Sequence, residues 1–142
     1  MVQARGEVIV SCPSARAFAL LANPSRIPEW RPDVLEVSAV QGSGVGARYD
    51  EIIAFMGRKR QTFEVIEYEA GRLFAVKAIA GLALRPTQRY RVEPTGVSEA
   101  RITYEIDLPV RGGFVVMWPM LAAMIPSKWR GYAKELARAL SA

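Results

Sequence analysis

The sequence predicts an α+β fold in which a curved antiparallel sheet of about seven strands wraps around one long C-terminal helix. Three observations support this prediction. Strand-like segments follow one another almost without interruption up to residue 108, two short helical segments come after the first strand, and a long apolar segment follows Gly112-Gly113. Sequential strands joined by short turns form a meander with one buried face, so the helix is expected to lie against that face and leave a cavity.

The first predicted strand covers residues 7–10. Pro13 is placed for the first turn of a helix over residues 14–22, because proline needs no amide hydrogen there. Asn23-Pro24 ends that helix, and residues 25–30 form a second short one. Glycine- and proline-containing turns then separate the remaining predicted strands, which are residues 34–40, 47–56, 60–68, 73–79, 84–92 and 99–108.

The long helix is predicted over residues 114–140. Pro119 fits its first turn, whereas Pro126 removes an internal hydrogen bond and is expected to bend it. The alternative is a helix that begins near Ser127, after an irregular apolar segment. Residues 114–126 are too short to cross a bilayer, which takes about 20 apolar residues.

The length of 142 residues and the composition predict a single domain, residues 1–142. Residues 1–6 run directly into a strand pattern, so we expect no signal peptide. Cys12 is the one cysteine, which excludes an internal disulfide and favours the reducing cytoplasm.

The chain has no histidine, so it lacks the commonest metal ligand and the commonest general base. We therefore expect no metal, no cofactor and no histidine-dependent catalytic group. The net charge is +5, but the basic residues are scattered and only Arg58-Lys59-Arg60 forms a run. That run follows Gly57 at a predicted hairpin turn, so nucleic acid is not an expected partner, while contact with an anionic membrane surface or an acidic ligand stays open.

Period-two alternation predicts which side chains face the helix. The strand over residues 47–56 has two possible inward sets. We assign Tyr49, Glu51, Ile53 and Phe55 inward because this set holds two aromatic rings. A carboxyl group inside an apolar cavity has a raised pKa and can serve as a general acid or base. The candidate catalytic residues are therefore Glu51 together with Tyr90 and Tyr104, whose hydroxyls could donate to a carbonyl oxygen.

The candidate ligand-binding residues are the other large or polar side chains expected on the inner faces. Aromatic residues on inward faces are more often ordinary core residues than ligand contacts, and Trp30 could simply pack the short helices onto the sheet. The set is Trp30, Tyr49, Phe55, Phe63, Phe74, Gln88, Trp118, Leu121 and Ile125.

The segment from Val8 to Trp30 has a strand, a proline-led helix bearing an aromatic residue, and an Asn-Pro turn that leads to a tryptophan. Together with Gly44-Val45-Gly46 and the segment from Tyr90 to Gly96, it resembles the START-like (SRPBCC) superfamily, most closely its polyketide cyclase/dehydrase-like branch. The resemblance covers nearly the whole chain, although no single motif is sharp. It implies a helix-grip fold that binds lipids, polyketides or other apolar ligands, and some members catalyse ring closure or dehydration. No residue role transfers from it.

Three functional hypotheses remain open. The first is a cofactor-free protein that binds an apolar, lipid- or polyketide-like molecule. The second is a cyclase or dehydratase that uses Glu51 and a tyrosine. The third is an interaction module that presents residues 58–60 and the methionine-rich segment to a protein or membrane. The oligomeric state, monomer or homodimer, is also open.

Overall fold

The computed structural model describes residues 2–82 and 84–141. It confirms the predicted α+β helix-grip fold, with seven antiparallel strands and a long C-terminal helix. The elements in chain order are β1 (Val2–Val10), α1 (Ser14–Leu21), the 3-10 helix η1 (Pro24–Glu29), β2 (Val34–Gln41), β3 (Arg48–Ala54), β4 (Arg58–Glu69), β5 (Leu73–Ala80), β6 (Thr87–Gly96), β7 (Glu99–Leu108), the 3-10 helix η2 (Gly112–Met117) and α2 (Trp118–Leu140).

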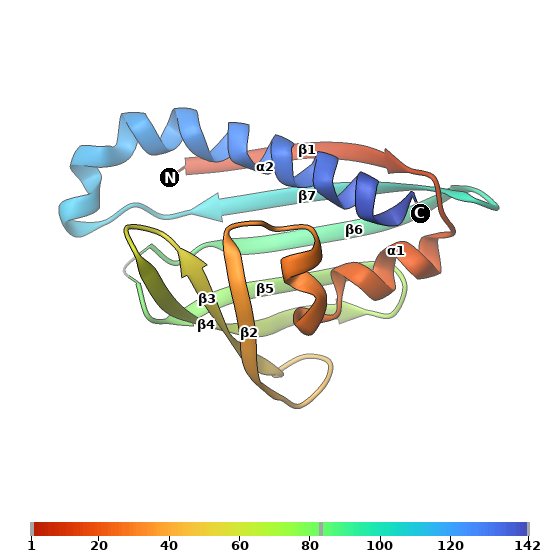
Figure 1. Cartoon of the computed structure of the whole chain (residues 1–142), viewed down its shortest axis with the longest axis horizontal. Coiled ribbons are helices and arrows are strands. Elements are labelled where there is room, and N and C mark those ends of the chain that lie inside the picture. The colour runs from red at the N-terminus through yellow and green to blue at the C-terminus, as the bar shows by residue number, and fades with distance from the viewer. Residues whose placement is uncertain (1, 83, 142) are drawn as a thin grey trace.

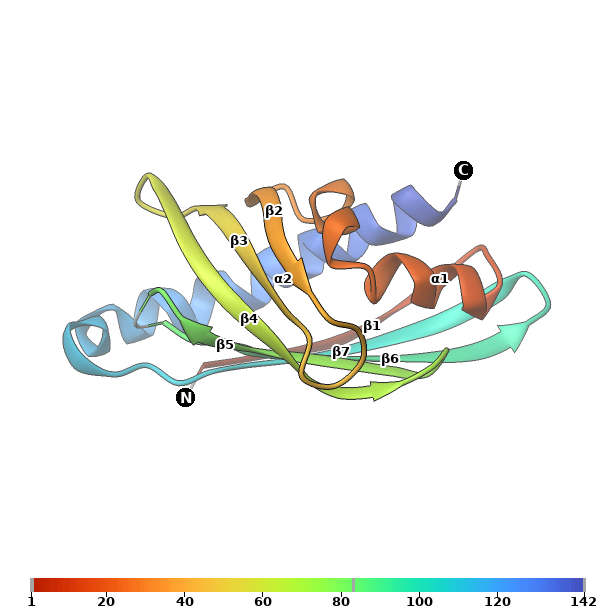
Figure 2. The ribbon, with the colours of Figure 1, turned by 90° about the horizontal axis from the view of Figure 1, so that it is seen from below.

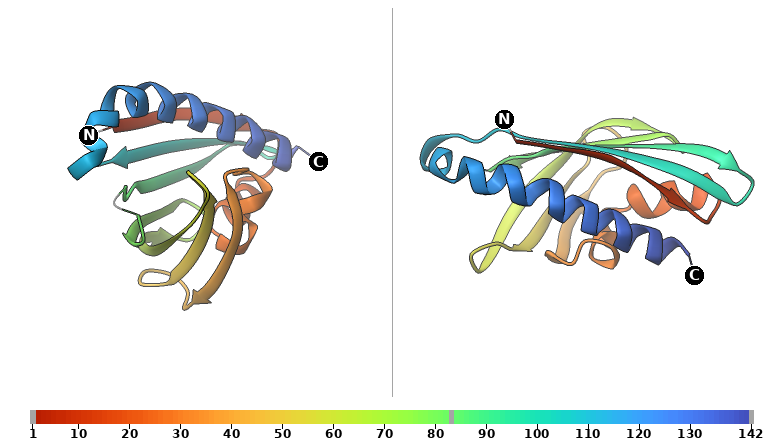
Figure 3. Two further views of the ribbon diagram at one scale, coloured as in Figure 1. Left: turned by 60° about the vertical axis from the view of Figure 1, so that its left-hand side comes forward. Right: turned by 90° about the horizontal axis from the view of Figure 1, so that it is seen from above.

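The strands are ordered β1-β7-β6-β5-β4-β3-β2, and every neighbouring pair is antiparallel. Only β1 departs from a simple meander, because it pairs with β7 at one edge while β2 forms the other edge. α2 runs along the concave face beside β1 (Figure 1). β2, β3 and β4 rise steeply from the plane of the other strands, so the sheet curls around the helix (Figure 2). α1 and η1 fill the opening between β2 and the C-terminal half of α2 (Figure 3).

The buried apolar residues form two groups. The larger, called here the main core, packs α1, η1 and the C-terminal half of α2 onto the sheet, and its fully buried members include Leu20, Leu21 and Ile102. The smaller, called here the end cluster, consists of Val2, Leu84, Leu108 and Leu121, with side chains such as Phe55 and Met124 packed against it. The candidate site lies where these two groups meet.

The C-terminal helix differs from the sequence prediction at its start. Residues 112–117 form a 3-10 helix, and regular α-helix begins at Trp118 with Pro119 in its first turn. A start at Ser127 is wrong, because α2 continues through Pro126. Pro126 has no amide hydrogen for the carbonyl of Ala122, so the helix lacks one hydrogen bond at that point. Within the described residues, no helix is both long and apolar enough to cross a membrane.

Two glycines allow close approaches that shape the sheet. Gly6 on β1 pairs with Tyr104 on β7, and a Cβ atom at position 6 would lie 2.5 Å from the Tyr104 hydroxyl oxygen. Gly81 has a φ of +104°, and a Cβ there would collide with the Arg60 carbonyl oxygen. The first contact places the Tyr104 ring over β1, and the second holds the end of β5 against β4.

Candidate functional site

A cavity of about 120 Å³ lies between the sheet and α2, at the junction of the main core and the end cluster. Strands β3, β4, β6 and β7, the connections between η1 and β2 and between β5 and β6, and one face of α2 supply its walls. Most of the wall is apolar. The apolar lining includes Phe55, Phe63, Leu84, Leu108, Leu121 and Ile125, and the polar lining includes Arg31, Asp33, Gln61, Gln88, Lys128 and Tyr132.

The polar groups concentrate around Arg31, which follows η1 and is only 5% exposed. Its guanidinium donates to both carboxylate oxygens of Asp33, at 3.3 and 2.9 Å, and its Nη1 lies 3.6 Å from Oε1 of Glu51. The guanidinium carbon is also 5.2 Å from the ring centroid of Trp129 and 5.7 Å from that of Tyr132, both on α2. Arg31 thus ties the connection between η1 and β2 to the long helix through charge and cation–π contacts.

Glu51 contacts Arg31 but does not line the cavity, and it is completely buried. Among the described residues, neither of its carboxylate oxygens has a hydrogen-bond partner, and the same holds for Nη1 of Arg31. Burial raises the pKa of Glu51, and the positive charge of Arg31 offsets only part of that rise. Burial alone would lower the pKa of Arg31, but the Glu51 and Asp33 carboxylates outweigh it and hold that pKa above its ordinary value. The pair therefore joins a permanent cation to a carboxyl group that holds its proton more strongly than usual.

Two glutamines of the cavity wall, Gln88 on β6 and Gln61 on β4, are fixed by hydrogen bonds, whereas Tyr90 on β6 does not line the cavity. The Tyr90 hydroxyl donates to the Gln88 side-chain oxygen at 2.9 Å, which leaves the Gln88 amide nitrogen as the group that can donate to a ligand. Gln61 on β4 donates to the Leu84 carbonyl at 2.5 Å and so anchors that part of the cavity wall. Burial raises the pKa of Tyr90 far enough that its phenol stays protonated.

Two further tyrosines differ in their access to the cavity. Tyr132 lines it, and burial together with the neighbouring Asp33 carboxylate raises its pKa to about 12. Tyr104 does not line it, because its ring lies over Gly6 and packs 6.1 Å from Trp129 between centroids. Burial raises the pKa of Tyr104 as well.

The structure brings five of the predicted binding residues to the cavity wall: Phe55, Phe63, Gln88, Leu121 and Ile125. Tyr49 and Glu51 are both buried, which is the inward parity predicted for this strand, but neither lines this cavity. Tyr49 stacks on Phe63 and, with Phe74, lines a second cavity of about 200 Å³ near the glycine turn between β2 and β3.

The remaining predicted residues lie outside the cavity wall. Trp30 packs edge-on against Tyr90 and Trp129, with centroid distances of 5.8 and 6.3 Å, so it joins the short helices to the core. Trp118 is 45% exposed. Its surroundings are open because η2 and the first turn of α2 extend past the ends of β1 and β7 (Figure 1).

Sequence reasoning missed the residues with the most distinctive chemistry at this site. Lys128, Trp129 and Tyr132 continue the helix face that holds Leu121 and Ile125, so helical spacing applied beyond Ile125 would have found them. Arg31 and Asp33 lie in a short connection that has no periodicity, and nothing in the sequence pattern marks them. Within the described residues, no three Cys, Asp or Glu side chains gather as a possible metal site.

Comparisons with known proteins agree with this architecture. A family model described as "Polyketide cyclase / dehydrase and lipid transport" matches residues 1–141. A search of curated protein sequences finds no match.

Solved structures are similar over almost the whole chain. A START superfamily protein from Mycobacterium smegmatis has a TM-score of 0.79 at 16% identity, covering 97% of this chain and 96% of that one. The Zhui aromatase/cyclase from Streptomyces sp. R1128 has a TM-score of 0.75 at 14% identity, with 96% and 92% covered. The di-domain ARO/CYC BexL of the BE-7585A biosynthetic pathway has a TM-score of 0.73 at 15% identity, and the match covers 96% of this chain and 46% of that one. At such identities the likeness establishes the fold.

Proposed function

Because this chain belongs to the polyketide cyclase/dehydrase and lipid transport family, we propose that it binds an apolar, lipid- or polyketide-like small molecule between the sheet and α2. The observation that carries the proposal is the cavity itself, with mostly apolar walls and one concentrated polar group at Arg31. An apolar pocket with a few placed polar groups is the usual design of a small-molecule site.

The charges around Arg31 limit the chemistry of the ligand. Arg31 already faces the carboxyl groups of Asp33 and Glu51, so the cluster has no uncompensated positive charge for a free carboxylate. Nη1 of Arg31 donates no hydrogen bond to another described residue, so it and the amide nitrogen of Gln88 can each donate one to a ligand. The expected ligand is therefore an apolar body with a neutral oxygen acceptor, such as a ketone, an ester or a hydroxyl.

The size of the cavity adds a second condition. Sites for drug-sized ligands have volumes of about 300–1,000 Å³, and this cavity has about 120 Å³. A ligand of lipid or polyketide size therefore requires side chains of the end cluster, such as Leu84 and Leu121, to move aside. We expect binding to open the cavity at that end, where the smaller of the two apolar groups lies.

The test has two steps. Native mass spectrometry and organic extraction identify any molecule that co-purifies with the protein, and that molecule is then titrated into the ligand-free protein. The substitution Ile125→Trp fills the cavity from α2 and is expected to abolish the bound mass and the ligand-induced thermal shift. The matched control is Met120→Trp on the exposed face of the same helix, which should bind as the unchanged chain does. Equal binding by both variants would place the ligand elsewhere and overturn the proposal.

A second candidate function is proton-transfer catalysis on such a ligand, as in a cyclase or dehydratase. The buried Glu51 favours it, because burial raises the pKa of this carboxyl group and the group lies 3.6 Å from Nη1 of Arg31, which lines the cavity. Glu51 itself does not line the cavity, so direct proton exchange requires a ligand that opens the wall beside Arg31. Arg31 would stabilise the enolate oxygen that forms. Tyr90 and Tyr104 are assigned no direct step, since the first hydroxyl donates to Gln88 and the second lies over Gly6. This reaction needs no cofactor.

The two candidates separate with Glu51→Gln, a substitution that keeps the shape of the side chain and removes its acid–base chemistry. Catalysis predicts loss of turnover of the co-purifying compound with retained binding. Glu64→Gln on the opposite face of the sheet is the control. Full turnover by Glu51→Gln would exclude this role.

We also propose the cytoplasm as the working compartment, because Cys12 is free and buried.

A further inference from the structure

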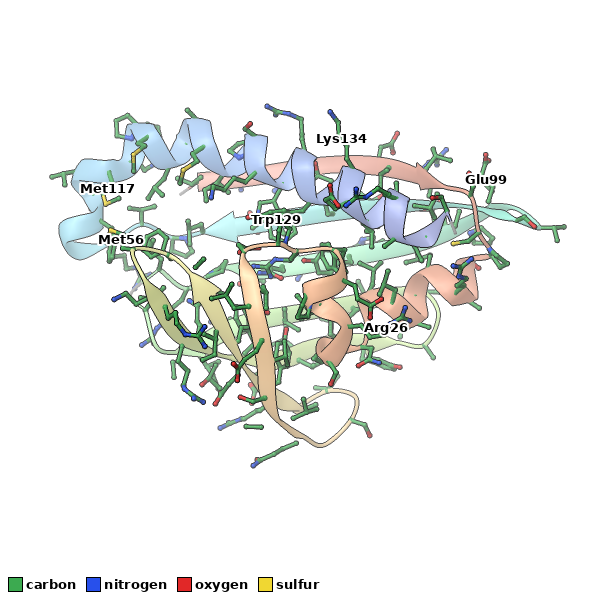
Figure 4. All side chains as sticks on the ribbon, viewed as in Figure 1. Arg26, Met56, Glu99, Met117, Trp129 and Lys134 are labelled. Atoms are coloured by element: carbon green, nitrogen blue, oxygen red, sulfur yellow. The ribbon has the colours of Figure 1, made fainter. Side chains whose placement is uncertain are left out.

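Large apolar side chains are exposed at one end of the molecule, on two separate segments. η2 and the first turn of α2 present Val115, Val116, Trp118 and Met120, with Val116 85% exposed. The turn between β3 and β4 presents Met56, which is 70% exposed. Figure 4 labels Met56 and Met117 at this end, which is also the end where η2 and that turn lie in Figure 2. These five exposed side chains are called here the apolar tip.

The chain segments that build this end contain basic residues and no acidic ones. Residues 53–61, 79–89 and 108–128 form the two parts of the tip and the wall between them, and they contain no Asp or Glu. All fourteen acidic residues of the chain lie outside these three segments. A surface that combines exposed apolar side chains with one sign of charge is typical of a binding face.

Three of the basic side chains at this end are available to a partner. Lys59 follows the β3–β4 turn, Arg111 precedes η2, and Lys128 lies on α2 at the cavity. None of the three has an ion pair with another described residue, whereas Arg58 pairs with Glu36 and so is partly compensated. The tip is therefore an apolar patch accompanied by uncompensated positive charge.

We propose that the apolar tip docks on an anionic lipid bilayer, with its apolar side chains in the acyl boundary and Lys59 and Arg111 at the headgroups. Interfacial binding of this kind depends on inserted apolar side chains together with basic residues that meet anionic lipids. A second copy of the chain fits less well, because it would bring a second basic surface against the first. Phe114 and Met117 lie beside the tip residues in sequence and pack against the end cluster, so a docked molecule holds the cavity close to the bilayer. The docking does not depend on the proposed ligand and is tested without one.

The first test compares two exposed valines in co-sedimentation with vesicles of equimolar phosphatidylcholine and phosphatidylglycerol. Val116→Glu places a charge in the tip and is expected to weaken binding by about tenfold or more, because a buried valine contributes at least that much. Val97→Glu is the matched control, since Val97 is 93% exposed on the β6–β7 turn at the other end. Neither change affects the core. Equal losses in the two variants would overturn the proposal.

The second test concerns charge. Each basic residue near an anionic surface strengthens binding by about fivefold, so Lys59→Gln with Arg111→Gln should weaken binding by about 25-fold. Arg72→Gln with Arg91→Gln is the control, because these exposed residues lie near the β4–β5 turn, away from the tip. Added salt should weaken binding of the unchanged chain, and pure phosphatidylcholine vesicles should bind it poorly. Binding to neutral vesicles that equals binding to anionic ones would contradict the role of charge.

Tryptophan fluorescence gives an independent signal. All three tryptophans lie in the described part of the chain, and Trp118 is exposed while Trp30 and Trp129 are buried. Docking should shift the emission to shorter wavelength, and Trp118→Phe should remove the shift. Light scattering after gel filtration tests the alternative that a second copy of the chain covers the apolar tip. A dimer that Val116→Glu converts to a monomer would assign the tip to a second copy and overturn membrane docking.

Discussion

The two halves of α2 lie in very different surroundings. From Trp129 to Leu140 the helix buries one face against the sheet, α1 and η1, and it contributes large side chains to the main core. From Trp118 to Ile125 only Leu121 is fully buried, and the neighbouring side chains border the cavity or solvent. The same helix is therefore closely packed at one end and borders open space at the other, which is the arrangement that the proposed binding site requires. Such a division is expected where a binding site must open while the rest of the domain stays folded.

The largest expected effect comes from Arg31→Met, which removes the cation that holds the connection between η1 and β2 against the C-terminal half of α2. Glu51 and Asp33 would be left without their partner, so the free energy of unfolding should fall by about 3–5 kcal/mol. Urea denaturation measures this loss. The control is Arg26→Met, which breaks the exposed pair between Arg26 and Glu29 and should cost at most about 1 kcal/mol. Similar losses for the two variants would show that the buried cluster does not hold the helix.

A smaller difference should separate two leucines on α2. Leu136→Ala creates a new void in the main core and should lower the free energy of unfolding by about 2–5 kcal/mol. Leu121→Ala widens a cavity that already exists, so its cost should lie at the low end of that range. Amide hydrogen exchange should be fastest in the first turns of α2 in both variants. A larger cost at Leu121 than at Leu136 would reverse the assignment of the two halves.

The smallest expected effect is on pH dependence. Burial raises the pKa of Glu51, so the folded chain keeps this proton at pH values where the unfolded chain has released it. The free energy of unfolding contributed by this group is then greatest at low pH, and it falls as the pH rises above the ordinary value of 4.5 toward the folded-state pKa. Glu51→Gln should remove that slope in urea titrations, and Glu64→Gln should keep it. An unchanged slope in Glu51→Gln would assign the pH dependence to other groups.

The sheet could be predicted closely from sequence because a period of two leaves little choice. Phe63 and Val65, for example, are buried as expected, and the polar residues Thr62 and Glu64 that alternate with them are not. The start of the C-terminal helix was less predictable, because an apolar segment with prolines fits either a 3-10 or an α-helical turn. Only packing against the sheet decides between them, and residues 112–117 extend beyond the sheet.

The candidate site was predictable only where it lies on regular elements. Glu51 and Gln88 follow the strand alternation, so their inward direction could be expected. Arg31 reaches the interior from a connection whose path depends on η1 and on the rings of Trp129 and Tyr132. Since a buried arginine is placed by its partners rather than by local pattern, a single sequence carried no sign of it.

The contact between Gly6 and Tyr104 limits the register in which β1 can pair with β7 as the sheet forms. β1 is an edge strand with one pairing partner, so it could slide along β7 more easily than any interior strand. A slip of two residues would keep its inward face but would bring Ala4 or Val8 beneath the Tyr104 ring, where no Cβ fits. Only one alignment of β1 leaves room for the ring. The lack of a Cβ atom at Gly6 therefore specifies the register in which β1 pairs with β7 beside α2.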